Sequence, residues 1–165
     1  MPTCTHKPNT MKTFLIGMMS LFLTVSLMAQ SREVRVRQFN SEEGIALQEY
    51  DPVAYFTVQK ALKGRKEFAY THQGITYYFF SQDNKYLFMK NPAHYEPQYG
   101  GWCAYAMAAG EKVEIDPKTF KIVEGKLYLF YNFFFNNTLT DWNKNEQSLK
   151  GRADSNWAKI ISANK

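Results

Sequence analysis

Short runs of apolar and aromatic residues, separated by glycine, proline and asparagine, set the pattern along the chain after residue 45. A run over 67–70, a turn at His72-Gln73-Gly74 and a returning run over 75–80 predict a β-hairpin. A second hairpin is predicted over residues 120–131, with its turn at Glu124-Gly125. Two hairpins of this kind, joined by helical segments, indicate an α+β fold, because an α/β fold is built from repeating strand–helix units.

Helices are predicted between and after these hairpins. Capping residues predict three of them, which are an entry at Asp51-Pro52, a helix from Ser81 to Lys90, and a short alanine-rich helix after Cys103 that ends at Gly110. A helical tail is expected to begin at 133–135, to break at Gly151 and to resume over 153–161. The prediction is an α+β fold, a small antiparallel sheet of two hairpins packed with several short helices and a helical C-terminal tail.

An uncharged apolar stretch, residues 14–28, follows Met11-Lys12-Thr13. A basic start, an apolar stretch and Ala29 at its end predict a signal peptide over 1–29. The protein is then expected to be exported to the periplasm or beyond the cell, and an over-called start over residues 1–10, upstream of Met11, is part of the same expectation. An uncleaved N-terminal anchor is the alternative, although the stretch is short for a membrane span. A flexible lead-in is expected over 30–44 and one domain over 45–162.

Composition narrows the class of protein. The chain of 165 residues has 45% hydrophobic, 16% aromatic and 21% charged residues, which excludes a disordered chain or a coiled coil. Two cysteines exclude a disulfide scaffold. Loss of residues 1–29, with their two lysines, lowers the net charge from +5 to +3. The remaining basic residues are scattered among acids, so no nucleic-acid partner is expected.

Several short motifs are distributed over most of the chain after residue 45. They are Asp51-Pro52-Val53-Ala54-Tyr55-Phe56, Tyr77-Tyr78-Phe79-Phe80-Ser81, Phe88 with Asn91-Pro92 and Tyr95, Pro97 to Ala106, Gly125 to Leu129, and Ala153 to Trp157. Together they resemble the YHS domain family, and the later ones its longer secreted bacterial members. This resemblance implies the fold, and it implies metal handling only for short relatives whose cysteines bind metal.

The cysteines of those short relatives are missing here. Ala54 stands two residues after the Asp-Pro pair, where they carry a cysteine, and the segment around Phe80 and Ser81 contains none. The metal site of the short relatives is therefore not carried over to this chain. What the resemblance leaves is the fold and the likeness to secreted proteins.

A different metal site is predicted around Cys103, the only cysteine left after cleavage. The candidate ligands are His72, His94, Cys103 and Met107, with Met89 as a further sulfur. Thiolate or thioether sulfur with imidazole suits copper, and a thiolate with histidines also suits zinc. Cys103 and Met107 are four residues apart and share a helix face. The leading hypothesis is a secreted, non-enzymatic YHS-type module that binds a metal ion or a small ligand. Its most specific form is a copper site of His94 and Cys103, with His72 or Met107 as a further ligand.

Two alternatives stay open at this point. In the first, Cys103 is a small buried thiol without metal, and the protein is a structural or interaction module whose aromatic surface includes Phe133 to Phe135. In the second, a Cys103–His94 pair makes a cysteine-dependent enzyme. The sequence contains neither a Gly-x-Ser-x-Gly elbow nor a glycine-rich phosphate loop, so we expect no enzyme.

Overall fold

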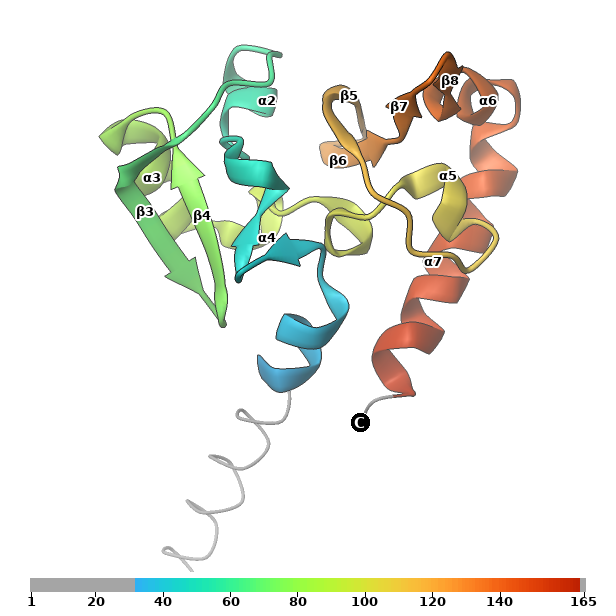
Figure 1. Ribbon diagram of the computed structural model, residues 1–165, viewed down its shortest axis with the longest axis horizontal. Coiled ribbons are helices and arrows are strands. Elements are labelled where there is room, and N and C mark those ends of the chain that lie inside the picture. Colours follow the sequence, from blue (N-terminus) through green and yellow to red (C-terminus); the bar gives the residue numbers. More distant parts are fainter. Residues whose placement is uncertain (1–31, 164–165) are drawn as a thin grey trace, which may run out of the picture.

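The computed structural model describes residues 32–163 and confirms an α+β fold. Its strands are β1 (Ser41–Glu42), β2 (Ile45–Ala46), β3 (Arg65–His72), β4 (Ile75–Phe79), β5 (Asp116–Val123), β6 (Lys126–Phe130), β7 (Asn132–Phe133) and β8 (Asn136–Asn137). Its helices and helical turns are η1 (Leu47–Glu49), α2 (Ala54–Thr57), α3 (Gln82–Lys90), α4 (Pro92–Tyr95), η2 (Gln98–Gly101), α5 (Ala104–Met107), α6 (Thr138–Lys144) and α7 (Glu146–Ser162). Figure 1 shows the sheet of β3 and β4 with α3 on one side of the molecule, and β5 to β8 with α5 to α7 on the other.

The first predicted hairpin is β3–β4. The two strands pair antiparallel up to His72 and Ile75, and Gln73 and Gly74 form the turn with φ of 46° and 90°. A two-residue turn with both φ positive matches the right-handed twist of the strands. Alternate residues of β4, namely Ile75, Tyr77 and Phe79, are fully buried, so this strand presents one face to the core.

The two hairpins do not share a sheet, which corrects the predicted arrangement. The first sheet has the order β1-β2-β4-β3, and β5–β6 forms a separate pair. Within the first sheet, β2 runs parallel to β4, with Ile45 opposite Thr76. Because β2 occupies the free edge of β4, that edge is closed to the second hairpin.

Strand β6 instead lies between two hydrophobic cores. Leu127 and Leu129 belong to the first core, while Tyr128 and Phe130 belong to the second. Successive side chains of a strand point to opposite faces, so β6 contributes to both. The buried residues of the first core are Ala46, Leu47, Val53, Tyr55, Ile75, Tyr77, Phe79, Phe88, Cys103, Ile115, Leu127 and Leu129. Those of the second are Tyr99, Ala104, Met107, Ala108, Tyr128, Phe130, Trp142, Leu149 and Ala153.

The segment expected to be a flexible lead-in, 30–44, contains regular structure over its described part. Residues 32–38 are helical, and β1 follows. Val34 is buried, and Arg35 forms an ion pair of 2.5 Å with Glu96. The polar composition suggested a solvated tail, but its charge partner lies far along the chain. The predicted signal peptide over 1–29 lies outside the described residues.

The predicted helical tail is wrong at two points. Phe133 to Phe135 form part of the β7–β8 hairpin, and α7 continues through Gly151. Glycine costs a helix interior about 0.5–1 kcal/mol relative to alanine. Leu149 and Ala153 pack into the second core on either side of Gly151 and offset that cost. Within the described part of the chain, no helix is long and apolar enough to cross a membrane.

Candidate functional site

Cys103 immediately precedes α5, at the boundary between the two cores, and its side chain is fully buried. Its backbone forms a parallel bridge with Leu129 of β6. The Tyr131 amide donates to Sγ at 3.4 Å, and Sγ lies 3.4 Å from Thr138 Oγ1. Thr138 Oγ1 donates its hydrogen to the Tyr131 carbonyl at 3.0 Å, so the thiol is the donor to Thr138. The expectation that Cys103 is a buried thiol is confirmed.

This surrounding predicts an unreactive thiol in the folded protein. We expect Cys103 to be inert to an aromatic disulfide reagent at pH 8 in buffer and to react fully in denaturant, because attack requires an exposed thiolate. The measurement is the absorbance of the released thiolate against time. Rapid native labelling, faster than global unfolding, would contradict a sealed core position.

His94 lies on the surface, at the third position of α4. Its ring packs against Phe56, with centroids 4.9 Å apart, and against Tyr95 at 4.7 Å. His72 lies half-buried at the end of β3, with its ring 6.1 Å from that of Phe88. The two predicted ligands are therefore held by aromatic neighbours on different elements.

The charged groups that act on His72 are Glu96 and Arg35, and Arg35 lies in the helix of residues 32–38. Glu96 Oε1 accepts hydrogen bonds from Arg35 Nη2 at 2.5 Å and from Tyr77 Oη at 2.7 Å. Partial burial lowers the pKa of His72; Glu96 opposes this shift and Arg35 supports it. Burial, and then Glu96, raise the pKa of Tyr77 well above its usual range. Tyr77 is consequently a neutral phenol, and the shared Glu96 carboxylate links residues 32–38 to β4.

The predicted copper ligands are not brought together. Met107 is fully buried in the second core, Cys103 belongs to the first, and Met89 is 43% exposed on α3. Across residues 32–163, no three His, Cys, Asp or Glu side chains are grouped so that they could hold a metal ion. The Met107 amide donates to the Cys103 carbonyl at 3.0 Å, but Cys103 precedes α5 with a non-helical backbone, so the predicted shared helix face does not form.

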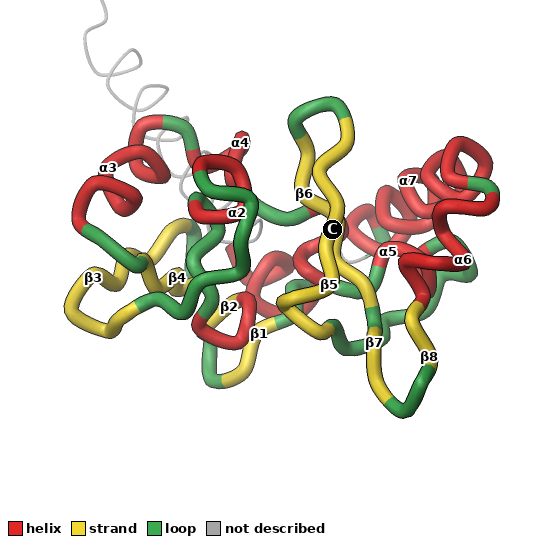
Figure 2. Tube along the Cα trace, turned by 90° about the horizontal axis from the view of Figure 1, so that it is seen from above, coloured by secondary structure: helices red, strands yellow, loops and turns green. Residues whose placement is uncertain are grey.

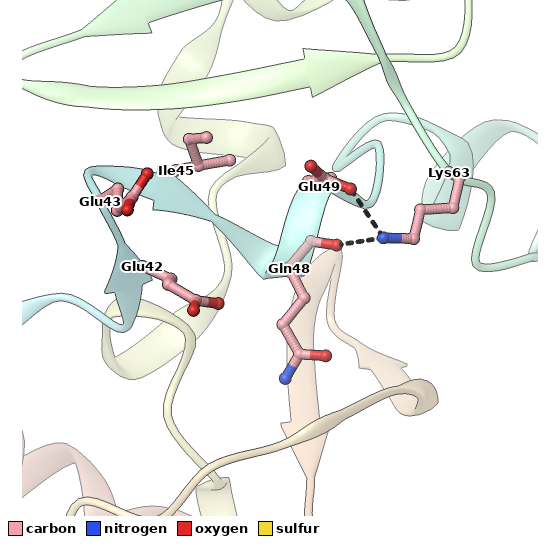
Figure 3. Close-up of a pocket in the computed structure, with 6 residues that line it drawn as sticks. All are labelled: Glu42, Glu43, Ile45, Gln48, Glu49 and Lys63. Atoms are coloured by element: carbon pink, nitrogen blue, oxygen red, sulfur yellow. Dashed lines mark hydrogen bonds and ion pairs between the residues drawn. The ribbon is translucent and has the colours of Figure 1, made fainter.

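A shallow hollow of about 410 Å³ lies beside η1, and sequence reasoning did not anticipate it. Its lining residues are Glu42, Glu43, Ile45, Gln48, Glu49 and Lys63. Figure 3 shows Lys63 reaching Glu49, while Glu42 and Glu43 stand apart from it. Lys63 Nζ lies 2.9 Å from Glu49 Oε2 and 3.0 Å from the Gln48 carbonyl oxygen. All three glutamates are exposed, which is the ordinary condition of solvated surface carboxylates.

Among the described residues, the two most exposed aromatic side chains, Phe134 and Phe135, lie at the turn of the β7–β8 hairpin. Phe134 is 92% exposed, Phe135 111% and Phe133 42%. The turn has two residues, and both have positive φ, 50° at Phe134 and 64° at Phe135. We call Phe133, Phe134 and Phe135 the phenylalanine tip. Sequence reasoning included these residues in an aromatic surface but placed them on a helix.

Comparisons with known proteins add no relative to this picture. No family model, curated protein or solved structure matches this chain. The resemblance to the YHS family, given on the motifs above, stays a prediction. Asp51, in the first of those motifs, is fully buried and accepts hydrogen bonds from the start of α2, the end of β4 and α3, so its role in this chain is in the fold.

Proposed function

We propose that this protein is an exported, non-enzymatic binding module that docks through the phenylalanine tip. The observation that carries the proposal is the exposure of Phe134 and Phe135, 92% and 111%, at the end of a hairpin. Large apolar side chains exposed together on a soluble domain mark interaction sites. Export is supported by the apolar segment over 14–28. The non-enzymatic part is supported by the bonding of Cys103 Sγ to Thr138 and Tyr131.

Folding alone gives no reason for phenylalanine at these positions. A two-residue turn with both φ positive strongly favours Asn-Gly, because bulky residues are strained in the left-handed region. That region costs a residue other than glycine about 1–2 kcal/mol. Phe134 and Phe135 bear this strain and leave their rings in water. Burial of each ring would instead contribute about 1.5–3 kcal/mol of favourable free energy. A docking function accounts for both costs.

Photo-crosslinking in cells tests docking without assuming a partner. With p-benzoylphenylalanine in place of Phe135, we expect an irradiation-dependent adduct, either a protein band or labelled lipid. The control carries the same residue in place of Val58, which is 50% exposed and apolar but lies outside the phenylalanine tip. Equal labelling at both positions, or none at position 135, would reject docking through the tip.

The copper hypothesis stays a prediction beside this proposal. It requires His94 or His72 to approach a sulfur that now bonds Thr138 and Tyr131. Elemental analysis of freshly purified protein, together with the spectrum of a thiolate–copper charge-transfer band, tests it. Stoichiometric copper that is lost in Cys103→Ser would support it, and zinc would appear in the same analysis without the band.

A further inference from the structure

The apolar area of the phenylalanine tip is small and has a polar boundary. Phe133 is partly covered by Tyr131, whose ring centroid lies 5.1 Å away, and Asn132, Asn136 and Asn137 complete the hairpin. Each phenylalanine offers about 150–250 Å², so the exposed parts of the three supply roughly 400–600 Å². A stable protein interface buries about 800 Å² on each partner. The tip is therefore too small to hold a protein partner by itself.

The composition of the hairpin suits a nonpolar medium. Residues 131–140 contain no Asp, Glu, Lys, Arg or His, so insertion of the tip desolvates no charge. The strands pair Asn132 with Asn137 and Phe133 with Asn136, and the Thr138 amide donates to the Tyr131 carbonyl at 3.0 Å. This internal pairing reduces the cost of moving the backbone out of water.

The position of the hairpin gives the rings access to a flat surface. Figure 2 shows β7 and β8 projecting beyond α6 and the other strands at one edge of the molecule. A projecting turn with two exposed rings reaches a broad, flat surface before the body of the domain does. Phenylalanine is among the apolar residues that enter the boundary between headgroups and acyl chains, and asparagine amides can stay hydrated at that depth.

We infer that the phenylalanine tip inserts into the surface of a zwitterionic lipid bilayer and holds the domain there reversibly. This rests on the proposed docking function and names its occupant. Insertion is driven by apolar burial of Phe134 and Phe135, with no part taken by charged side chains of the hairpin. Binding is therefore expected to depend little on anionic lipid or on salt.

Depth-dependent quenching of a tryptophan at the tip tests this inference in the full chain. In Phe135→Trp, vesicles of brominated phosphatidylcholine are expected to quench the added emission at least twofold more than unbrominated vesicles do. The control is Tyr86→Trp, at a position 54% exposed on α3, whose added emission is expected to stay unquenched. Both variants contain the apolar segment over 14–28, so a difference in quenching between them reports insertion of the tip itself.

A second variant removes the rings and keeps the hairpin. Phe134→Asn combined with Phe135→Gly gives the turn its preferred residues, and we expect vesicle partitioning through the tip to fall at least tenfold with stability retained. Unquenched Phe135→Trp, with a protein adduct in the crosslinking experiment, would overturn the lipid assignment and leave docking intact. Absence of both signals would reject docking too. Quenching that requires anionic lipid and disappears in high salt would overturn insertion by apolar burial.

Discussion

Replacement of Asp51 with alanine is expected to lower the free energy of unfolding by about 3–5 kcal/mol, because several donors would lose their acceptor at a cost of about 1–3 kcal/mol for each one left unpaired and buried. The carboxylate is fully buried. Oδ1 accepts from the amides of Val53 at 2.8 Å and Ala54 at 3.3 Å, and Oδ2 from the Phe80 amide at 2.8 Å and Asn84 Nδ2 at 2.6 Å. One side chain thereby joins the start of α2 to the end of β4 and to α3, and alanine leaves these donors unpaired.

Thermal and urea unfolding of the Asp51→Ala variant measure this effect. A loss of this size corresponds to a decrease in Tm of about 10 °C or more for a domain of this length. The matched control is Asp83→Ala, an exposed acid in the first turn of α3, whose loss is expected to cost about 0.3–1 kcal/mol. Similar midpoints for both variants would mean that the Asp51 network contributes little to stability.

Replacement of Gly64 with alanine is expected to destabilise the protein by about 3 kcal/mol, at the upper end of the range for overpacking. A Cβ at this position would lie 2.4 Å from the carbonyl carbon of Tyr78 and 2.5 Å from its oxygen. These are backbone atoms of β4, so the added methyl group can fit only if the segment just before β3 moves away from β4. The Gly64 amide also donates to the Glu49 carbonyl at 2.8 Å, and that bond resists the movement.

Gly151→Ala is the matched control for this substitution and should have the opposite sign. Gly151 lies in α7, and no atom lies within 4 Å of the position of an added Cβ. Alanine there is expected to stabilise by about 0.5–1 kcal/mol through helix propensity. The urea midpoints of the two variants should move in opposite directions, and a shift of both to lower urea would refute the steric explanation.

Local signals in the sequence were sufficient for many elements. Ser81 Oγ accepts from the Asn84 amide at 3.2 Å at the start of α3, as its capping role predicted. Gly110 has a φ of 84°, and the turn at Glu124-Gly125 has positive φ at both residues. Such features depend on interactions between residues close in sequence, and single residue types report them.

Sequence pattern and structure differ where local preference and tertiary packing disagree. Three successive phenylalanines do not favour a two-residue turn, yet Phe134 and Phe135 occupy one. Glycine usually interrupts a helix, but Gly151 lies inside α7 because the residues around it pack into the second core. Sheet membership also depended on which strand reached the edge of β4, and the pairing of Ile45 with Thr76 decided it.

The sequence by itself determined the fold class, both main hairpins, most of the caps and the burial expected of a lone cysteine, because each depends on residue type and short spacing. Only the tertiary structure decided which side chains meet. It separated Cys103, His94 and His72, and it gave the Glu96 carboxylate both Arg35 and Tyr77 as partners. It also left Phe134 and Phe135 in solvent. Contacts between distant residues depend on how whole elements pack, and no short stretch of sequence contains that information.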